Sequence, residues 1–549
     1  MIEDRIKKLG IELPSSSPPG GIYVPVKRVG NTVYVSGQIP MKNGTPCYVG
    51  KVGGERSLEY AQDAARLCVI NMLAALKAYL GDLEKIKSVV KLVAFVNSEV
   101  GFDKQHLVID AASQLLLDVL GESGQHARSA VGTNQLPLNV TVEIEGVFEI
   151  YDSKEIQYDF DTAVNRKGIG NLKDYCTPKN IQDMGILSFS GAEMDFKTAP
   201  VIIDAMVERA KNGLFGFTLC DDNYKNAIKW WMKTQRNWAI EDEWIVPTYG
   251  TIKSVATSIR AFTDVGDGVI IQPPVYPRYG QAIMRTGRCV ISNPLVLRDG
   301  RYEMDFDHLE KCMCDSKAKL MILCNPHNPI SKVWEPEDLA RIAAIAEEHS
   351  VIVFSDEIFG EIIFEDNVMI PYSDVSLADK NCLVSTSLGK VFNLTGMNNA
   401  NIVIPNEEIR ERFVRQRDED HYGSIDPMAH AAVCAGYSVK GADWAQQMRD
   451  YVYGNVQMVH KFFKDHLPGI KVYETQGSYV LWIDWSALSM DDEDLYRFLV
   501  QEAFLHLEPG ANYGQGGVGF MRMNIATTRG NLERALSLLL RAIQLRFGL

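Results

Sequence analysis

The stretch LVSTSLGKVFNLTG, residues 383–396, begins as an apolar strand and then turns into small and hydroxylated residues around one lysine, Lys390. Two earlier stretches share this design: LMILCNPHNP carries Asn325 and Asn328 at its end, and VIVFSDE carries Asp356. Gly, Pro or Asn bounds each strand, and a helix-length segment separates it from the next. This alternation predicts a doubly wound, parallel α/β sheet with ligand groups at the carboxyl ends of its strands.

The residue types at these strand ends suit one kind of chemistry. A carboxylate at the tip of an apolar strand can hold a buried cationic ring, and desolvation can lower the pKa of a lysine until it acts as nucleophile and base. Taken singly, Asp356 could cap a helix and the Asn-Pro pairs could form turns. Their joint order along the chain favours a site.

The composition bounds the class of protein. At 549 residues the chain is too long for one ordinary core, so two to four domains are expected. Its 46% of hydrophobic and 23% of charged residues are typical of a globular protein with large cores. The formal charge of −14 repels phosphate backbones and anionic lipid, which argues against nucleic acid as a partner.

The ten cysteines include no zinc-type pairs, so we expect reduced thiols and no metal site. The first residues, MIEDRIKKLGIELPSSSPPGG, lack the apolar core of a secretion signal, and no window approaches the length of a membrane span. The sequence therefore predicts a cytoplasmic protein that has no membrane partner.

The N-terminal part has a different pattern. Strand-like IYVPVKRVGNTVYVSGQ is followed by a helix from Ser57 to about Leu80, a strand SVVKLVAFVNS, a helix around 103–120 and a strand NVTVEIEGVFEI. This order predicts an α+β domain. A polar stretch without periodicity follows, so we place the boundary between domains of residues 1–152 and 153–549.

Two charged residues of this N-terminal part could act together. Arg128 lies just before an apolar turn, and Glu143 lies on the last strand. Such a pair could bind a carboxylate and orient a water molecule. A salt bridge or two solvated groups is the structural alternative.

The C-terminal part resembles the fold-type I pyridoxal-phosphate (PLP) enzymes, and within them the MalY/PatB branch of cystathionine β-lyases and cysteine C–S lyases. The resemblance runs from about Tyr158 to Leu549 through EMDFKTAP, GLFGF, QPPVYPRY, MILCNPHNPISKVW, VIVFSDEIF, STSLGKVFN, EPGANYG and GFMRMNIATTR. It implies a large doubly wound cofactor domain at about 200–440 and a small α+β domain formed by about 158–199 and 441–549.

The resemblance also implies a role for each site residue. Lys390 would hold the cofactor covalently and move the Cα proton, and Asp356 would keep the pyridine nitrogen protonated, which makes the ring an electron sink. Arg522 would clamp the α-carboxylate of an amino-acid substrate. The remaining cofactor contacts would be Asn328 at the phenolate oxygen, Tyr276 on the ring face, and Gly250, Thr251, Ile252 and Ser387 at the phosphate.

The chain departs from the family pattern at four positions. Phe217 replaces a tyrosine that reaches the cofactor phosphate of a neighbouring subunit, and Phe359 replaces a tyrosine or histidine beside the ring oxygen. Ile330 lies in NPISK where the pattern is NPTGK, and Asn398 replaces the arginine of aminotransferases. These changes argue against ordinary transamination.

The N-terminal part resembles the Rid/YjgF family of enamine and imine deaminases, which have a chorismate-mutase-like fold, through VGNTVYVSGQIP and ARSAVG…LP…VEIE. The resemblance implies that Arg128 grips a substrate carboxylate, that Glu143 orients the water, and that Tyr23 and Ser36 line the pocket. Ala130 stands where active members carry a cysteine.

Together the two resemblances imply a short pathway. A lyase would expel a thiolate from Cβ of its substrate and release 2-aminoacrylate, which a Rid domain would hydrolyse to a 2-keto acid and ammonia. Three alternatives stay open: a specialised biosynthetic PLP enzyme (γ-elimination or replacement, cyclisation or oxidation), an aminotransferase, and a noncatalytic Rid-like assembly module.

The resemblances imply a homo-oligomer as well. Rid proteins are trimers and the lyases are dimers, each with sites between subunits. A chain that satisfies both would form a hexamer of D3 symmetry.

Overall fold

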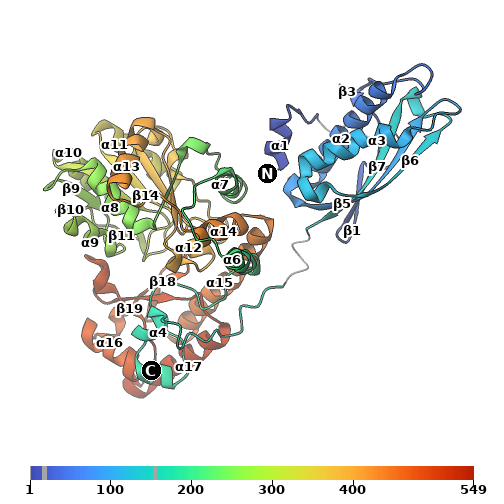
Figure 1. Cartoon of the computed structure of the whole chain (residues 1–549). Helices are drawn as coiled ribbons and strands as arrows, with labels where there is room; N and C mark the ends of the chain where they lie inside the picture. The colour runs from blue at the N-terminus through green and yellow to red at the C-terminus, as the bar shows by residue number, and fades with distance from the viewer. Residues whose placement is uncertain (1, 15–20, 152–156, 549) are drawn as a thin grey trace. The chain divides into compact units, whose positions relative to one another are not determined.

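The computed structural model describes residues 2–14, 21–151 and 157–548. The chain divides into two compact units, Met1–Gln157 and Tyr158–Leu549 (Figure 1). The boundary expected at 152/153 falls within residues 152–156, which lie outside the described residues.

The N-terminal unit is a five-stranded sheet of order β1-β2-β7-β5-β6 with helices α2 and α3 on one face (Figure 1). Strands β5 and β6 are parallel, and the other neighbours are antiparallel. Its elements are α1 (Ile2–Lys8), β1 (Val26–Val29), β2 (Thr32–Gln38), β3 (Met41–Lys42), β4 (Thr45–Pro46), α2 (Leu58–Leu80), β5 (Ile86–Asn97), α3 (Gln105–Leu120), β6 (Ala127–Thr133) and β7 (Val142–Ile150).

The helix predicted from Ser57 to about Leu80 is confirmed. Ser57 caps α2 by accepting a hydrogen bond from the Tyr60 amide at 3.2 Å, as serine does at helix N-termini. The apolar face of α2 is buried against the sheet. Helix α1 was not expected from the sequence, and it buries Ile2 and Ile6 in the same core.

The C-terminal unit is built on a seven-stranded sheet of order β10-β9-β13-β14-β15-β16-β8. The five strands from β10 to β15 run parallel, whereas β16 is antiparallel to both of its neighbours. The strands are β8 (Ile245–Thr248), β9 (Gly268–Ile271), β10 (Cys289–Ser292), β13 (Ala318–Cys324), β14 (Ile352–Asp356), β15 (Cys382–Thr386) and β16 (Ala400–Val403). The predicted α/β class and doubly wound sheet are confirmed.

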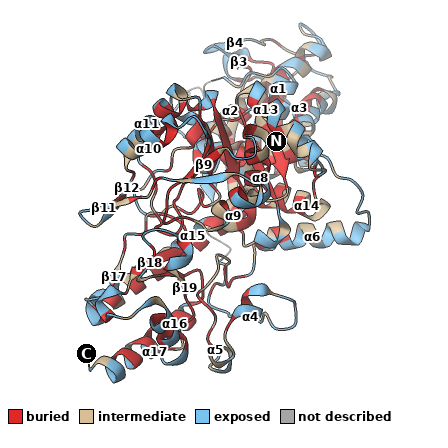
Figure 2. Cartoon of the chain, turned by 90° about the vertical axis from the view of Figure 1, so that its left-hand side faces the viewer, coloured by how far each residue is buried: buried red, intermediate tan, exposed pale blue. Residues whose placement is uncertain are grey.

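The central strands of this sheet are buried, as Figure 2 shows in red. Burial on both faces explains why they read as continuous apolar runs and not as alternating ones. One face packs on α8 (Thr251–Phe262), α9 (Arg278–Arg285) and α13 (Glu407–Glu419). The other helices of this region are α6 (Pro200–Asn212), α7 (Asp222–Arg236), α10 (Phe306–Cys314), α11 (Pro336–Glu348), α12 (Leu388–Val391) and α14 (Pro427–Gly436), and β11 (Val296–Arg298) and β12 (Arg301–Glu303) form a hairpin.

A second, antiparallel sheet of order β17-β18-β20-β19 completes the unit. Its strands are β17 (Lys471–Val472), β18 (Val480–Asp484), β19 (Glu508–Pro509) and β20 (Phe520–Asn524), and its helices are α15 (Val439–His466), α16 (Asp492–Gln501) and α17 (Arg529–Phe547). The segment with α4 (Leu172–Cys176) and α5 (Lys179–Asp183) joins this part through backbone hydrogen bonds such as Phe189 N to His506 O at 3.0 Å.

Candidate active site

Three adjacent parallel strands bring the predicted site residues to one edge of the large sheet. In the register of the sheet, Cys324 of β13 pairs with Asp356 of β14, and Asp356 pairs with Ser385 of β15. Asn328 follows β13 and Lys390 follows β15. Because the carboxyl ends of parallel strands lie at the same edge, these side chains meet there.

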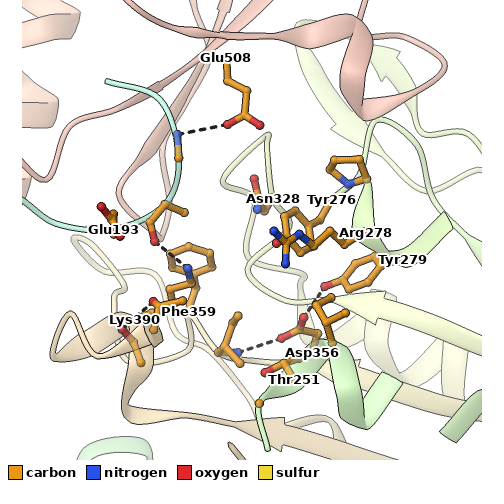
Figure 3. A pocket seen from close by; sticks show the side chains of 18 of the residues that line it. Glu193, Thr251, Tyr276, Arg278, Tyr279, Asn328, Asp356, Phe359, Lys390 and Glu508 are labelled. Atoms are coloured by element: carbon orange, nitrogen blue, oxygen red, sulfur yellow. Dashed lines mark hydrogen bonds between the residues drawn. The ribbon is translucent and has the colours of Figure 1, made fainter. Parts of the chain in front are cut away.

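They line a cavity of about 1000 Å³, part of which is shown in Figure 3. All nine residues expected at a PLP site line it: Gly250, Thr251, Ile252, Tyr276, Asn328, Asp356, Ser387, Lys390 and Arg522.

Lys390 lies in the short helix α12, which Ser387 caps by accepting a hydrogen bond from the Gly389 amide. Its Nζ donates to the Ala192 carbonyl at 2.7 Å, and the Tyr479 hydroxyl donates to the same carbonyl at 3.0 Å. Burial, and after it the nearby guanidinium of Arg522, lower the pKa of Lys390 to about 8. A sizeable fraction of the amine is therefore neutral near neutral pH.

Asp356 is 3% exposed at the end of β14. Burial raises its pKa to about 6, against the effect of hydrogen bonds from the Tyr279 hydroxyl and, at 3.3 Å, from the Ile358 amide. Within the described part of the chain no cationic side chain bonds to this carboxylate. The site thus presents a buried acid that a cationic ligand would complete.

Arg522 of β20 is 2% exposed and has two partners. Its Nη1 donates to Asn328 Oδ1 at 3.2 Å, and its Nη2 forms an ion pair with Glu508. Nε has no partner among the described residues. A substrate carboxylate at Arg522 would therefore compete with the carboxylate of Glu508.

Helix α8 begins at the cavity. Its first residues, Thr251 and Ile252, present amides that have no partner within the helix, so this end suits an anion such as phosphate. Gly250 precedes them with φ of +83°, a conformation that favours glycine. Ser387 also lines this cavity, but its hydroxyl donates to the Asn399 carbonyl at 2.6 Å.

The four departures from the family pattern occupy different places. Phe359 is buried in the cavity wall, with its ring centre 5.5 Å from Lys390 Nζ, so an apolar face borders the lysine. Asn398 lines the cavity beside Gly250. Ile330 is buried outside the lining, and Phe217 is fully exposed.

In the N-terminal unit the guanidinium of Arg128 bonds to three residues of helix α3. Its Nη2 contacts Asp110 Oδ1 at 2.6 Å and the His106 carbonyl at 3.1 Å, and its Nη1 donates to Ser113 Oγ at 2.9 Å. The ion-pair partner of Arg128 is therefore Asp110, which the sequence did not suggest, and not Glu143.

Glu143 lies on the other face of the sheet. Arg128 pairs in register with Leu92 of β5, whereas Glu143 pairs with Phe95, three positions further along the strand. Side chains alternate along a strand, so an odd offset places them on opposite faces. The two residues do not meet within one chain. Of the other expected pocket residues, Tyr23 is 50% exposed and Ser36 donates to the Val24 carbonyl at 2.8 Å.

Four residues around the cavity were missed in the sequence: Tyr279 at Asp356, Glu508 at Arg522, and Arg278 and Glu193 in the lining. Tyr279 and Arg278 follow Tyr276 in PPVYPRY, and Glu508 opens EPGANYG, so their positions were visible. The contacts of Tyr279 with Asp356 and of Glu508 with Arg522 form only in the folded chain, so the local sequence did not indicate them.

The chain matches two family models. Residues 185–539 match the aminotransferase class I and II model, and residues 3–149 match the YjgF/chorismate-mutase-like model. Over the described residues, no helix combines the length and apolarity needed to span a membrane.

Similar proteins cover the C-terminal unit's length. Cystathionine β-lyase PatB of Bacillus subtilis is 33% identical over 381 residues, 69% of this chain and 98% of that protein. Protein MalY of Escherichia coli is 31% identical over 390 residues, 70% of this chain and 99% of that protein. The crystal structure of cystalysin from Treponema denticola, which contains pyridoxal 5'-phosphate, has a TM-score of 0.68 at 31% identity and covers 71% of this chain and 99% of that one. The chain belongs to the aminotransferase class I and II family of PLP-dependent enzymes, and it carries a YjgF-like domain ahead of the catalytic fold.

Proposed function

We propose that the C-terminal unit cleaves the carbon–sulfur bond of cystathionine or another cysteine S-conjugate by β-elimination. The observation that carries this proposal is the convergence of Lys390, Asp356 and Arg522 in one cavity. The names of the relatives, cystathionine β-lyases among them, support the same reaction.

The residues present fit PLP. Asp356 is buried without a cationic partner among the described residues, so a protonated pyridine nitrogen would supply the missing charge. The start of α8 would hold the phosphate, and Tyr276, which lines the same cavity, would stack on the ring. Ser387 would have to release the Asn399 carbonyl before its hydroxyl could donate to the phosphate.

PLP, when bound, supplies an electron sink for the electron pair left at Cα. Arg522 would hold the substrate α-carboxylate in place of Glu508. Lys390 would take the Cα proton, and its lowered pKa leaves enough neutral amine to act as the base. The C–S electron pair would depart with the thiolate, and the products would be the thiol and 2-aminoacrylate.

We assign hydrolysis of this enamine to the N-terminal unit. After tautomerisation to the imine, a water molecule oriented by Glu143 would add to the imine carbon, and ammonia would leave to give pyruvate. Burial raises the pKa of Glu143, and neighbouring Glu145 raises it further, which suits a carboxyl that exchanges protons with water. Having both units on one chain would keep the hydrolase close to its substrate.

The opposite placement of Arg128 and Glu143 in one chain supports a site shared between copies. Arg128 of one protomer and Glu143 of another could then face the same substrate. We therefore propose a homo-oligomer, a dimer through the C-terminal unit and a trimer through the N-terminal unit, which together form a hexamer. A stable monomer in a light-scattering measurement would contradict it.

The first test is an absorbance spectrum of the purified protein with and without Lys390→Ala, followed by addition of L-cystathionine while pyruvate and thiol are recorded. A cofactor band that depends on Lys390, with both products appearing, supports the lyase. The same band without pyruvate would favour a specialised biosynthetic reaction. The apolar ring of Phe359 beside Lys390 supports that second candidate, because it offers no hydrogen bond to the cofactor.

A further inference from the structure

The cavity holds a cation that neither the fold nor the proposed reaction uses. The other positive side chains in its wall have partners. Arg522 is paired with Glu508 and Lys173 with Asp195. Lys390 donates to the Ala192 carbonyl, and Lys253 lies over the ring of Tyr422. Arg278 also lines the cavity, and among the described residues its guanidinium has no hydrogen-bond or ion-pair partner. More than a third of this residue is accessible to solvent.

Local structure does not explain an arginine at this position. Arg278 is the first residue of α9, where the partial positive charge of the helix end disfavours a cation. Within the described ranges it forms no hydrogen bond, ion pair or ring contact that would stabilise the fold in return. A residue that conflicts with its local structure and faces a cavity is expected to serve the cavity.

The charge of Arg278 acts on the reaction centre. It helps to lower the pKa of Lys390, after burial and Arg522, and it opposes the effect of burial on the pKa of Tyr276. In Figure 3 Arg278 is drawn in the upper half of the cavity with Tyr276 and Asn328, whereas Thr251, at the start of α8, lies at its foot. The guanidinium thus lies within electrostatic reach of the reacting amine and, in that view, apart from the phosphate end.

We propose that Arg278 binds a carboxylate on the thiol half of the substrate, so that the preferred substrates are cysteine S-conjugates whose sulfur carries a carboxylated chain. Arg522 accounts for the α-carboxylate of the cysteine half, which leaves Arg278 for a second anionic group. A guanidinium suits this task because its fork of N–H groups matches the two carboxylate oxygens. Cystathionine, whose thiol half ends in a carboxylate, belongs to this class. The inference rests on the proposed lyase function.

The experiment compares two conjugates of matched length, S-(2-carboxyethyl)-L-cysteine and S-propyl-L-cysteine. Both are tested on the full-length protein with PLP bound, as wild type, Arg278→Met and Arg278→Lys. Arg285→Met is the control, since Arg285 lies on the same helix but outside the cavity lining. Thiol release gives kcat/KM. Calorimetric titration of each version that also carries Lys390→Ala, which removes the proposed base and stops turnover, gives the dissociation constant.

We expect the wild type and Arg285→Met to prefer the carboxylated conjugate by about 10- to 100-fold, the range of a charge-assisted hydrogen bond. Arg278→Met should reduce that ratio to about one, and Arg278→Lys should retain part of it. An equal preference in the wild type, or a preference that survives Arg278→Met, overturns the proposal. Loss of bound PLP from Arg278→Met would also overturn it, because it would assign Arg278 to the cofactor. If neither conjugate releases thiol, the lyase function fails, and the ratio of dissociation constants still decides what Arg278 binds.

Discussion

The hydroxyl of Tyr279 donates a hydrogen bond to the carboxylate of Asp356, and both groups are buried at the carboxyl edge of the large sheet. This bond stabilises the ionised carboxylate against the burial that raises its pKa to about 6. Tyr279 therefore positions the acid expected to face the cofactor ring and helps to keep it charged.

Replacing Tyr279 by phenylalanine should weaken cofactor binding. Without the donor the pKa of Asp356 rises further, so less of it is ionised at neutral pH. We expect the dissociation constant of PLP to rise by roughly 10-fold at pH 7, the effect of one hydrogen bond to a charged group, and the loss to shrink as the pH increases. Absorbance titration of the cofactor-free protein between pH 6 and pH 9 measures both.

Tyr372→Phe is the matched control for that variant. Tyr372 is equally buried, but its hydroxyl has no partner in the described part of the chain and does not line the cavity. Its removal should leave the PLP dissociation constant unchanged. A pH-independent loss in Tyr279→Phe would mean that the ring of Tyr279, and not its hydroxyl, supports the cofactor.

Asp356 should also lower the stability of the cofactor-free protein at high pH. Its folded pKa of about 6 lies above the ordinary value of 3.8, so its contribution favours folding at low pH and is lost as the pH rises through 6. We expect Asp356→Asn to stabilise the cofactor-free protein at pH 8 by at most about 3 kcal/mol, with a smaller gain at pH 5. Thermal unfolding at both pH values tests this. A gain of equal size at both would contradict the assigned pKa.

From the lowered pKa of Lys390 we predict how the rate of its reaction with PLP depends on pH. Only the neutral amine attacks the aldehyde of PLP, and a pKa of about 8 places its titration well below the ordinary value for lysine, 10.5. The rate of capture by the cofactor-free protein should therefore rise up to about pH 8 and then level off. Stopped-flow absorbance follows the rate, and borohydride reduction with mass spectrometry identifies the labelled residue. A rate that keeps rising to pH 10 would place Lys390 in a wetter environment than the cavity provides.

The ion pair between Glu508 and Arg522 gives opposite effects on stability and binding. In Glu508→Gln the buried guanidinium loses its charged partner, which should cost about 2 kcal/mol of stability, less than a fully buried pair because Glu508 is 27% exposed. The substrate carboxylate would no longer compete with Glu508, so KM should fall. Thermal unfolding and steady-state kinetics on one preparation measure both changes. A higher KM would show that Glu508 assists binding.

The sequence predicted the strands and the polar residues at their ends because one short stretch of sequence encodes each strand with its end. Each is an apolar run followed by Asn328, Asp356 or Lys390. It did not predict the direction of β16, since nothing in an apolar strand of four residues encodes its orientation. The sequence also did not predict which groups these side chains contact. Tyr279 meets Asp356, and the Ala192 carbonyl meets Lys390, only through the tertiary fold.

The N-terminal unit shows the same limit more strongly. The sequence offered Arg128 and Glu143 as a possible pair, but the register places them on opposite faces of the sheet, because their partners on β5, Leu92 and Phe95, are three positions apart. Two variants test the proposed hydrolysis in the full-length enzyme. We expect Glu143→Gln and Arg128→Met each to increase the imine captured by semicarbazide during cystathionine cleavage by roughly 10-fold or more, as for loss of a general base or a carboxylate clamp. Unchanged capture in both would favour a noncatalytic assembly module.

The substitution Gly37→Ala tests whether the position of the Glu143 carboxylate matters for hydrolysis, because it moves this group without removing its charge. A Cβ added at Gly37 would lie 2.0 Å from Glu143 Oε1, so Gly37→Ala must displace the carboxylate while every charged residue is retained. Because the displaced group is the end of a flexible side chain, the cost in stability should stay within about 1 kcal/mol. Imine capture should nevertheless rise as in Glu143→Gln, because a displaced carboxylate no longer orients water over the substrate.

Gly30→Ala is the control for an added alanine side chain in this unit, since a Cβ there meets no atom within 4 Å, although its φ of +59° adds backbone strain. If Gly37→Ala captured no more imine than wild type, the position of Glu143 would not matter for the hydrolysis, and the assignment of that carboxylate to the water would be wrong.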